Sequence, residues 1–141
     1  MNSVAPHGHR ILIVDDNEDM RQALIAALTL RGYHCVAADH GESAIRCLDT
    51  DRFHLVISDY QMPIMDGIQF LETLKKRPTP SPPVILLTAS KSEELWRRAL
   101  ELGAHVVILK PFATQELVAL SARAIESRDL NLVPFSELGR T

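Results

Sequence analysis

The stretch Ile11-Leu12-Ile13-Val14-Asp15-Asp16 ends an apolar, β-branched run with two carboxylates, and this arrangement decides the fold. Later in the chain, similar apolar runs directly precede Asp59, Thr88 and Lys110. Short apolar runs that alternate with helical segments are typical of buried parallel strands joined by crossover helices. All strands of a parallel sheet point the same way. We therefore expect these polar residues to meet at one edge, where open α/β sheets place their ligands.

The rest of the sequence continues this alternation and predicts a three-layer α/β domain with helices on both faces of the sheet. Gly32 and Gly103 follow two helical segments and are typical of helix C-termini. Four prolines within 77–83 exclude a helix interior there and indicate a stiff connector. The expected strands cover residues 10–14, 34–38, 53–58, 84–88 and 105–109, and the expected helices cover 17–31, 41–49, 66–76, 92–102 and 114–126.

Length and composition indicate one globular domain. The chain has 141 residues, of which 46% are hydrophobic and 23% charged. We expect a flexible tail over 1–9, the domain over 10–127, and a C-terminal tail or linker stub over 128–141. The net charge of -3 argues against nucleic-acid binding. No apolar run reaches the roughly 20 residues of a membrane span, and the N-terminus lacks a signal peptide. A cytoplasmic protein without nucleic-acid or membrane contacts is expected.

The predicted edge holds three carboxylates, those of Asp15, Asp16 and Asp59. Asp15 and Asp16 alone could simply complement the start of a helix. A calcium loop of the EF-hand type is excluded, because Met20 and Ala26 stand where that loop needs glycine and glutamate. Two like charges about 4 Å apart repel by roughly 4 kcal/mol at an effective dielectric constant near 20, so the cluster needs a cation, a raised pKa, or both. Mg²⁺ fits best, with Mn²⁺ as an alternative.

Thr88 and Lys110 add a hydroxyl and an ammonium group to the same edge. A pure metal site needs neither group, whereas a phosphoryl group needs positive charge on its oxygens and a donor that fixes its orientation. A carboxylate in that setting can act as a nucleophile and form an aspartyl phosphate. The residues therefore indicate phosphoryl chemistry at a metal-binding carboxylate cluster.

Taken together, these residues form a pattern in which each part stands at the end of a predicted strand. Over residues 10–127 the chain resembles the receiver domains of bacterial two-component response regulators. The resemblance implies a flavodoxin-like (βα)5 fold with a parallel sheet of strand order 2-1-3-4-5. It rests on Asp15-Asp16, on Asp59 followed by Met62-Pro63 and Asp66-Gly67, on Thr88-Ala89 and on Lys110-Pro111-Phe112.

The resemblance also implies a role for each polar residue. Asp59 would accept a phosphoryl group from a sensor histidine kinase or a histidine phosphotransfer protein. Asp16, Asp59 and the backbone carbonyl of Gln61 would hold Mg²⁺, and Asp15 would act through a metal-bound water. Such a protein is a switch that catalyses only its own phosphorylation and dephosphorylation, and it is not a conventional enzyme.

Three further positions follow from the same resemblance. Lys110 would pair with the phosphoryl oxygens, with a cis bond to Pro111, and Thr88 would swing inward to hydrogen-bond the phosphoryl group. Gln61 and Ser90 would flank the attacking water and adjust the lifetime of the phosphoryl group.

The resemblance implies an output face formed by the fourth helix, the fifth strand and the fifth helix, where a downstream protein or a second copy would bind. The family usually has an aromatic residue three positions before the lysine, and here that position is Val107. Trp96 and Leu100 lie one helical turn apart and are expected beside Val107 on the outer face. They either cover the fifth strand or form an apolar docking patch.

Two other classes of protein remain open at this point. A pseudo-receiver would keep the fold as a binding module without phosphorylation. A phosphatase of the haloacid-dehalogenase type would also form an aspartyl phosphate, but it needs an acid where Gln61 stands. The position of the first strand near Met1 favours a stand-alone regulator or an N-terminal receiver fragment.

Overall fold

The computed structural model describes residues 8–130, which alternate between strands and helices as predicted. The strands of this described part are β1 (Arg10–Val14), β2 (His34–Ala38), β3 (Leu55–Asp59), β4 (Val84–Thr88) and β5 (Val106–Leu109). Its helices are α1 (Glu18–Thr29), α2 (Gly41–Thr50), α3 (Gly67–Lys76), α4 (Glu93–Glu101) and α5 (Thr114–Leu130).

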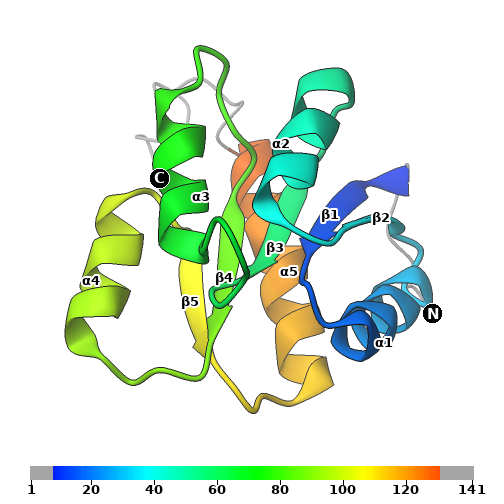
Figure 1. The fold of residues 1–141 in the computed structure, drawn as a ribbon. Coiled ribbons are helices and arrows are strands. Elements are labelled where there is room, and N and C mark those ends of the chain that lie inside the picture. Colours follow the sequence, from blue (N-terminus) through cyan, green and yellow to red (C-terminus); the bar gives the residue numbers. More distant parts are fainter. Residues whose placement is uncertain (1–7, 131–141) are drawn as a thin grey trace, which may run out of the picture.

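The five strands form one parallel sheet in the order β2-β1-β3-β4-β5, which confirms the expected flavodoxin-like topology. Helices α1 and α5 cover one face of this sheet, and α2, α3 and α4 cover the other (Figure 1). The order in which strands are added to the sheet reverses at β1, because β2 lies on one side of β1 and β3 on the other. Open α/β sheets bind their ligands at the carboxyl ends of the strands flanking such a reversal.

Each central strand contributes side chains to both hydrophobic cores. In β1, Leu12 and Val14 pack with the α2–α4 layer, whereas Ile11 and Ile13 pack with the α1–α5 layer. All four side chains are fully buried, which explains why β1 reads as an unbroken apolar run rather than an alternating one.

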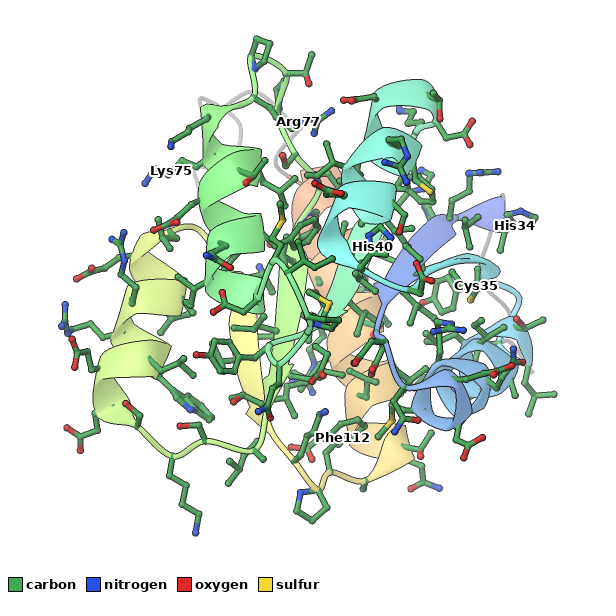
Figure 2. The ribbon with its side chains drawn as sticks, viewed as in Figure 1. His34, Cys35, His40, Lys75, Arg77 and Phe112 are labelled. Carbon is green, nitrogen blue, oxygen red and sulfur yellow. The ribbon has the colours of Figure 1, made fainter. Side chains whose placement is uncertain are left out.

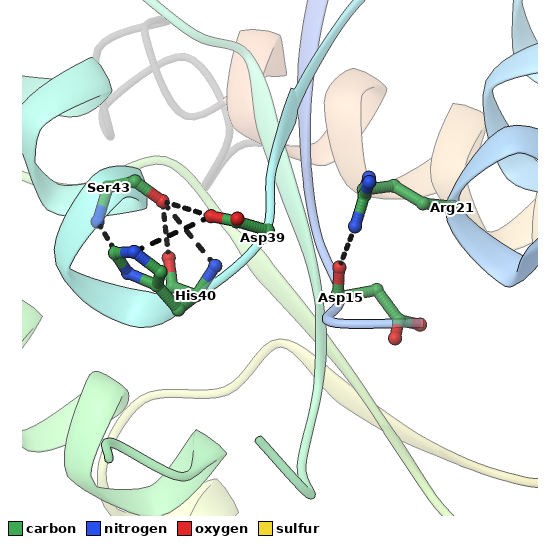
Figure 3. A network of polar contacts seen from close by, with 5 residues as sticks. All are labelled: Asp15, Arg21, Asp39, His40 and Ser43. Atoms are coloured by element: carbon green, nitrogen blue, oxygen red, sulfur yellow. Dashed lines mark hydrogen bonds and ion pairs between the residues drawn. The ribbon is translucent and has the colours of Figure 1, made fainter. Parts of the chain in front are cut away.

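Side-chain caps define where the helices begin. At α2, Ser43 N–H donates to the His40 ring nitrogen, and Ser43 also contacts Asp39 (Figure 3). At α3, Asp66 and Gln69 exchange two hydrogen bonds of 2.9 Å in a capping box. These caps place both helix starts beside the carboxyl ends of β2 and β3.

Several boundaries differ from the predicted ones by one or more residues, and the differences at β3 and α5 have clear causes. Strand β3 begins at Leu55 rather than at 53, because Phe53 is buried in the α2–α4 layer before the strand ladder starts. Helix α5 runs on to Leu130 instead of ending at 126, since no glycine or proline stops it. Most of the tail predicted over 1–9, and residues 131–141 of the one predicted over 128–141, lie outside the described residues. Within residues 8–130, no helix has the length and apolar character needed to cross a bilayer.

Candidate functional site

The three predicted carboxylates meet at the carboxyl edge of the sheet. Asp59 is the last residue of β3, and Asp15 and Asp16 directly follow β1. One carboxylate oxygen from each of the three residues lies within 4.8 Å of the corresponding oxygens of the other two. Asp15 and Asp59 are buried, whereas Asp16 is exposed. The cluster is therefore anchored in the core and open to solvent through one member.

Lys110 completes the cluster from the end of β5. Its Nζ atom lies 2.6 Å from Asp59 Oδ1, and its backbone N–H donates to the Thr88 carbonyl at 2.8 Å. The Lys110–Pro111 peptide bond is cis, as the resemblance implied. Phe112 follows at the same edge, whereas Lys75 and Arg77 lie at the opposite end of the molecule (Figure 2).

The backbone around Asp15 fixes its carboxylate. Asn17 N–H donates to Asp15 Oδ1 at 2.9 Å, and Arg21 Nη1 donates to the Asp15 backbone carbonyl at 2.7 Å (Figure 3). Asp15 Oδ2 is buried and has no hydrogen-bond partner within the described part of the chain. A buried carboxylate oxygen without a partner is costly unless a cation completes it.

The electrostatics of the cluster also favour a bound cation. Burial raises the pKa of Asp15 above its ordinary value, and the negative charges of Asp59 and Asp16 raise it further. The Asn17 N–H group and the Lys110 ammonium oppose this rise of the pKa without cancelling it. The cluster thus carries more negative charge than its surroundings neutralise. Oxygen ligands with excess negative charge suit a hard divalent cation, so these residues fit a metal site.

Thr88, at the end of β4, forms the wall of the site next to Lys110. Its side chain is buried, and its Oγ1 atom accepts a hydrogen bond of 3.0 Å from Ser90 N–H. Ser90 is half-buried, and Gln61, two residues beyond Asp59, is exposed. Ser90 and Gln61 lie in the loops that follow β4 and β3.

The three residues expected on the output face differ in exposure. Val107 is only 6% exposed, and its side chain belongs to the core beneath the α2–α4 layer, so it does not lie on the outer face. Trp96 is half-buried against the same core. Leu100 is 50% exposed. Val107 is less exposed than Leu100 because the face of β5 that carries Val107 lies under the helices.

Two features near the site were missed by sequence reasoning. Ile64 lies in the loop after Asp59 at the centre of a γ-turn, with φ of 71° and 82% exposure. A β-branched residue rarely adopts this conformation, and the residue type gives no signal for it. A groove of about 520 Å³ also borders Lys110, lined in part by Met20, Leu24 and Phe112. The spacing of Met20 and Leu24 on one helix is the signal that could have suggested it.

Comparison with known proteins places the chain in a family. The family model of the response regulator receiver domain matches residues 11–122, so the chain belongs to the response regulator receiver family. A probable chemotaxis protein CheY of Rhizobium etli is 40% identical over 112 residues, covering 78% of this chain and 87% of that protein. The fold of this chain is thus that of a CheY-like receiver domain.

Solved structures agree with this assignment. The chemotaxis response regulator CheY4 of Vibrio cholerae superposes with a TM-score of 0.77 at 29% identity, covering 83% of this chain and 98% of that one. A Francisella response regulator receiver domain gives a TM-score of 0.81 at 26% identity, covering 86% and 99%. Other relatives are longer: the chain spans only 24% of the response regulator protein FleR of Pseudomonas aeruginosa, to which it is 40% identical over 114 residues.

Proposed function

We propose that the protein is a phosphorylation-dependent switch whose phosphoacceptor is Asp59. The observation that carries this proposal is a buried carboxylate with an ammonium 2.6 Å away, inside a cluster of three carboxylates at the sheet edge. The phosphoryl donor would be a phosphohistidine on a sensor histidine kinase or a histidine phosphotransfer protein. In the reaction, an Asp59 oxygen attacks phosphorus, the phosphorus–nitrogen bond breaks, and the imidazole leaves.

The neighbouring residues support this transfer through charge and orientation. Lys110 already contacts Asp59, so its ammonium would shift to the incoming phosphoryl oxygens and neutralise them. Asp16, Asp59 and the Gln61 carbonyl would hold Mg²⁺, with Asp15 acting through water. The cation would offset the charge of the carboxylates and of the phosphoryl oxygens.

The loops that follow β3 and β4 would set how long the phosphoryl group survives. Thr88 would turn its hydroxyl from Ser90 toward the phosphoryl group, drawing the 88–90 segment inward. Gln61 and Ser90 carry no charge and would adjust the access of the hydrolytic water. Their places in the loops directly after β3 and β4 support this role.

The surroundings of the site suggest where partners bind. The groove lined by Met20, Leu24 and Phe112 borders Lys110, so an apolar surface of the phosphodonor protein would seat there. The α4–β5–α5 face with the exposed Leu100 would bind a downstream protein or a second copy.

Intact mass spectrometry after incubation with acetyl phosphate tests the proposal. We expect the wild type to gain one phosphoryl group only when Mg²⁺ is present, and Asp59→Asn to gain none. Asp19→Asn, which removes an exposed carboxylate outside the cluster, is the matched control and should behave like the wild type. If the wild type stays unmodified under all conditions, the protein is a pseudo-receiver.

A further inference from the structure

The chain contains a single tryptophan, Trp96, in the first turns of α4. Its ring packs against the core cluster that includes Val107 and Ala99. Its indole N–H leaves the helix and donates to the backbone carbonyl of Ser90 at 2.7 Å. Ser90 belongs to the loop after β4, two residues beyond Thr88. The indole therefore ties α4 to the segment that forms one wall of the phosphoryl site.

The hydrogen bonds continue from Ser90 to the site itself. Ser90 N–H donates to Thr88 Oγ1 at 3.0 Å, so a single residue links the indole to the threonine hydroxyl. Ser92 N–H donates to Ser90 Oγ at 3.1 Å, and Ser92 Oγ in turn accepts from Leu95 N–H as the cap of α4. Residues 88–92 are thus bonded both within themselves and to the helix.

The remaining attachments of α4 involve its C-terminal half. Ala99 is its only fully buried residue within the described chain. Arg98 pairs with Glu72 at 3.0 Å, and Lys75 Nζ donates to the Glu101 carbonyl at 3.3 Å, so both contacts join this half to α3. The N-terminal half is held by Trp96 and the serine contacts. A displacement of the 88–90 segment would consequently change the contacts of Trp96 before those of the C-terminal half of α4.

A simpler explanation is that a half-buried indole N–H needs some acceptor. That explanation accounts for a hydrogen bond but not for the choice of acceptor. The bond joins two elements at the one loop that carries Thr88, in a chain where position 107 has no aromatic ring.

We propose that Trp96 is a positioning residue that holds the 88–90 segment in the position seen in this structure and replaces the absent ring at Val107 as the aromatic part of the switch. This inference rests on the proposed function. When the phosphoryl group draws Thr88 inward, the Ser90 carbonyl leaves the indole. The Trp96 hydrogen bond therefore opposes activation, and its loss marks the activated state.

The experiment uses beryllofluoride with Mg²⁺, a mimic of the phosphoryl group on an aspartate. Because Trp96 is the single tryptophan, the tryptophan fluorescence of the protein reports on this residue alone. We expect the fluorescence emission of the wild type to change as the mimic binds. Trp96→Phe keeps a ring and removes the N–H, so it should bind the mimic more tightly by roughly two- to tenfold, as the loss of one opposing hydrogen bond implies. Isothermal titration calorimetry measures this affinity in both proteins. Arg97→Ala, which removes an exposed ion pair within α4, is the matched control and should bind like the wild type.

The outcomes separate this inference from the proposed function. An emission change in the wild type, with tighter binding in Trp96→Phe alone, supports the positioning role. Phosphorylation of Asp59 without any emission change overturns that role and leaves the proposed function intact. Binding of the mimic by Trp96→Phe that is equal to or weaker than that of the wild type also overturns it. Absence of both phosphorylation and mimic binding overturns the two proposals together. If Trp96→Phe does not fold, the emission of the wild type decides the question.

Discussion

Replacing Asp15 by asparagine should make the metal-free protein more stable. Asp15 is 1% exposed, and its carboxylate oxygen lies within 4.8 Å of those of Asp16 and Asp59. At that separation two unit charges repel by roughly 3 kcal/mol at an effective dielectric constant of 20. The attraction of Lys110 and the exposure of Asp16 offset part of this repulsion, so we expect a gain of about 1–3 kcal/mol in the free energy of unfolding.

The geometry of the substitution favours this result. Asparagine keeps the oxygen that accepts from Asn17 N–H. Its amide nitrogen replaces Oδ2, which has no partner among the described residues, and can donate to a neighbouring carboxylate. The substitution therefore removes a charge without removing a hydrogen bond.

Urea unfolding in the presence of EDTA measures the effect. Asp19→Asn is the control, because it removes an exposed carboxylate near the start of α1. That control should lose about 0.3–1 kcal/mol, since Asp19 complements the helix dipole, so the two substitutions are expected to have opposite signs. A metal-free Asp15→Asn protein that is no more stable than the wild type would refute the reasoning.

Mg²⁺ and pH provide two independent checks. A ligand at 100 times its dissociation constant stabilises a protein by about 2.7 kcal/mol. At the same Mg²⁺ concentration, the ion should therefore stabilise Asp15→Asn less than it stabilises the wild type. The pKa of Asp15 is raised in the folded protein. Asp15 therefore contributes fully to the stability of the fold at pH values below its ordinary pKa of 3.8, and this contribution is lost as pH rises through the raised pKa. The difference in the free energy of unfolding between Asp15→Asn and the wild type should therefore grow as pH rises through the raised pKa of Asp15.

Two further substitutions probe the frame of the site and its output face. Gly67→Ala should cost about 1–3 kcal/mol in urea unfolding, because the new Cβ would lie 2.8 Å from the backbone Cα of Tyr60. Gly41→Ala, also at the first position of a helix, would meet only a flexible methionine side chain, so an equal loss there would contradict this explanation. Leu100→Ser should change stability by less than about 0.5 kcal/mol, yet weaken binding of the phosphorylated protein to its target or a second copy. Unchanged binding in a pull-down would remove Leu100 from the output face.

The local sequence pattern was sufficient to locate the layers and the carboxyl edge of the sheet. Apolar runs of four residues are long enough for a buried strand and too short for a helix, so their positions followed from local pattern alone. The polar residue after each run then had to lie at the strand end, as with Asp59 and Lys110. The prediction went wrong at Phe53, because an apolar residue packs equally well just outside a strand.

How adjacent residues divide between core and solvent depends instead on packing between the layers. Asp15 and Asp16 are identical in chemistry, but the course of the backbone after β1 buries the first and exposes the second. Val107 is buried because α4 packs over β5, and Trp96 meets Ser90 because the loop after β4 returns beside the helix. Such contacts join residues through packing between layers. Local periodicity carries no information about which side chain the opposite layer presents.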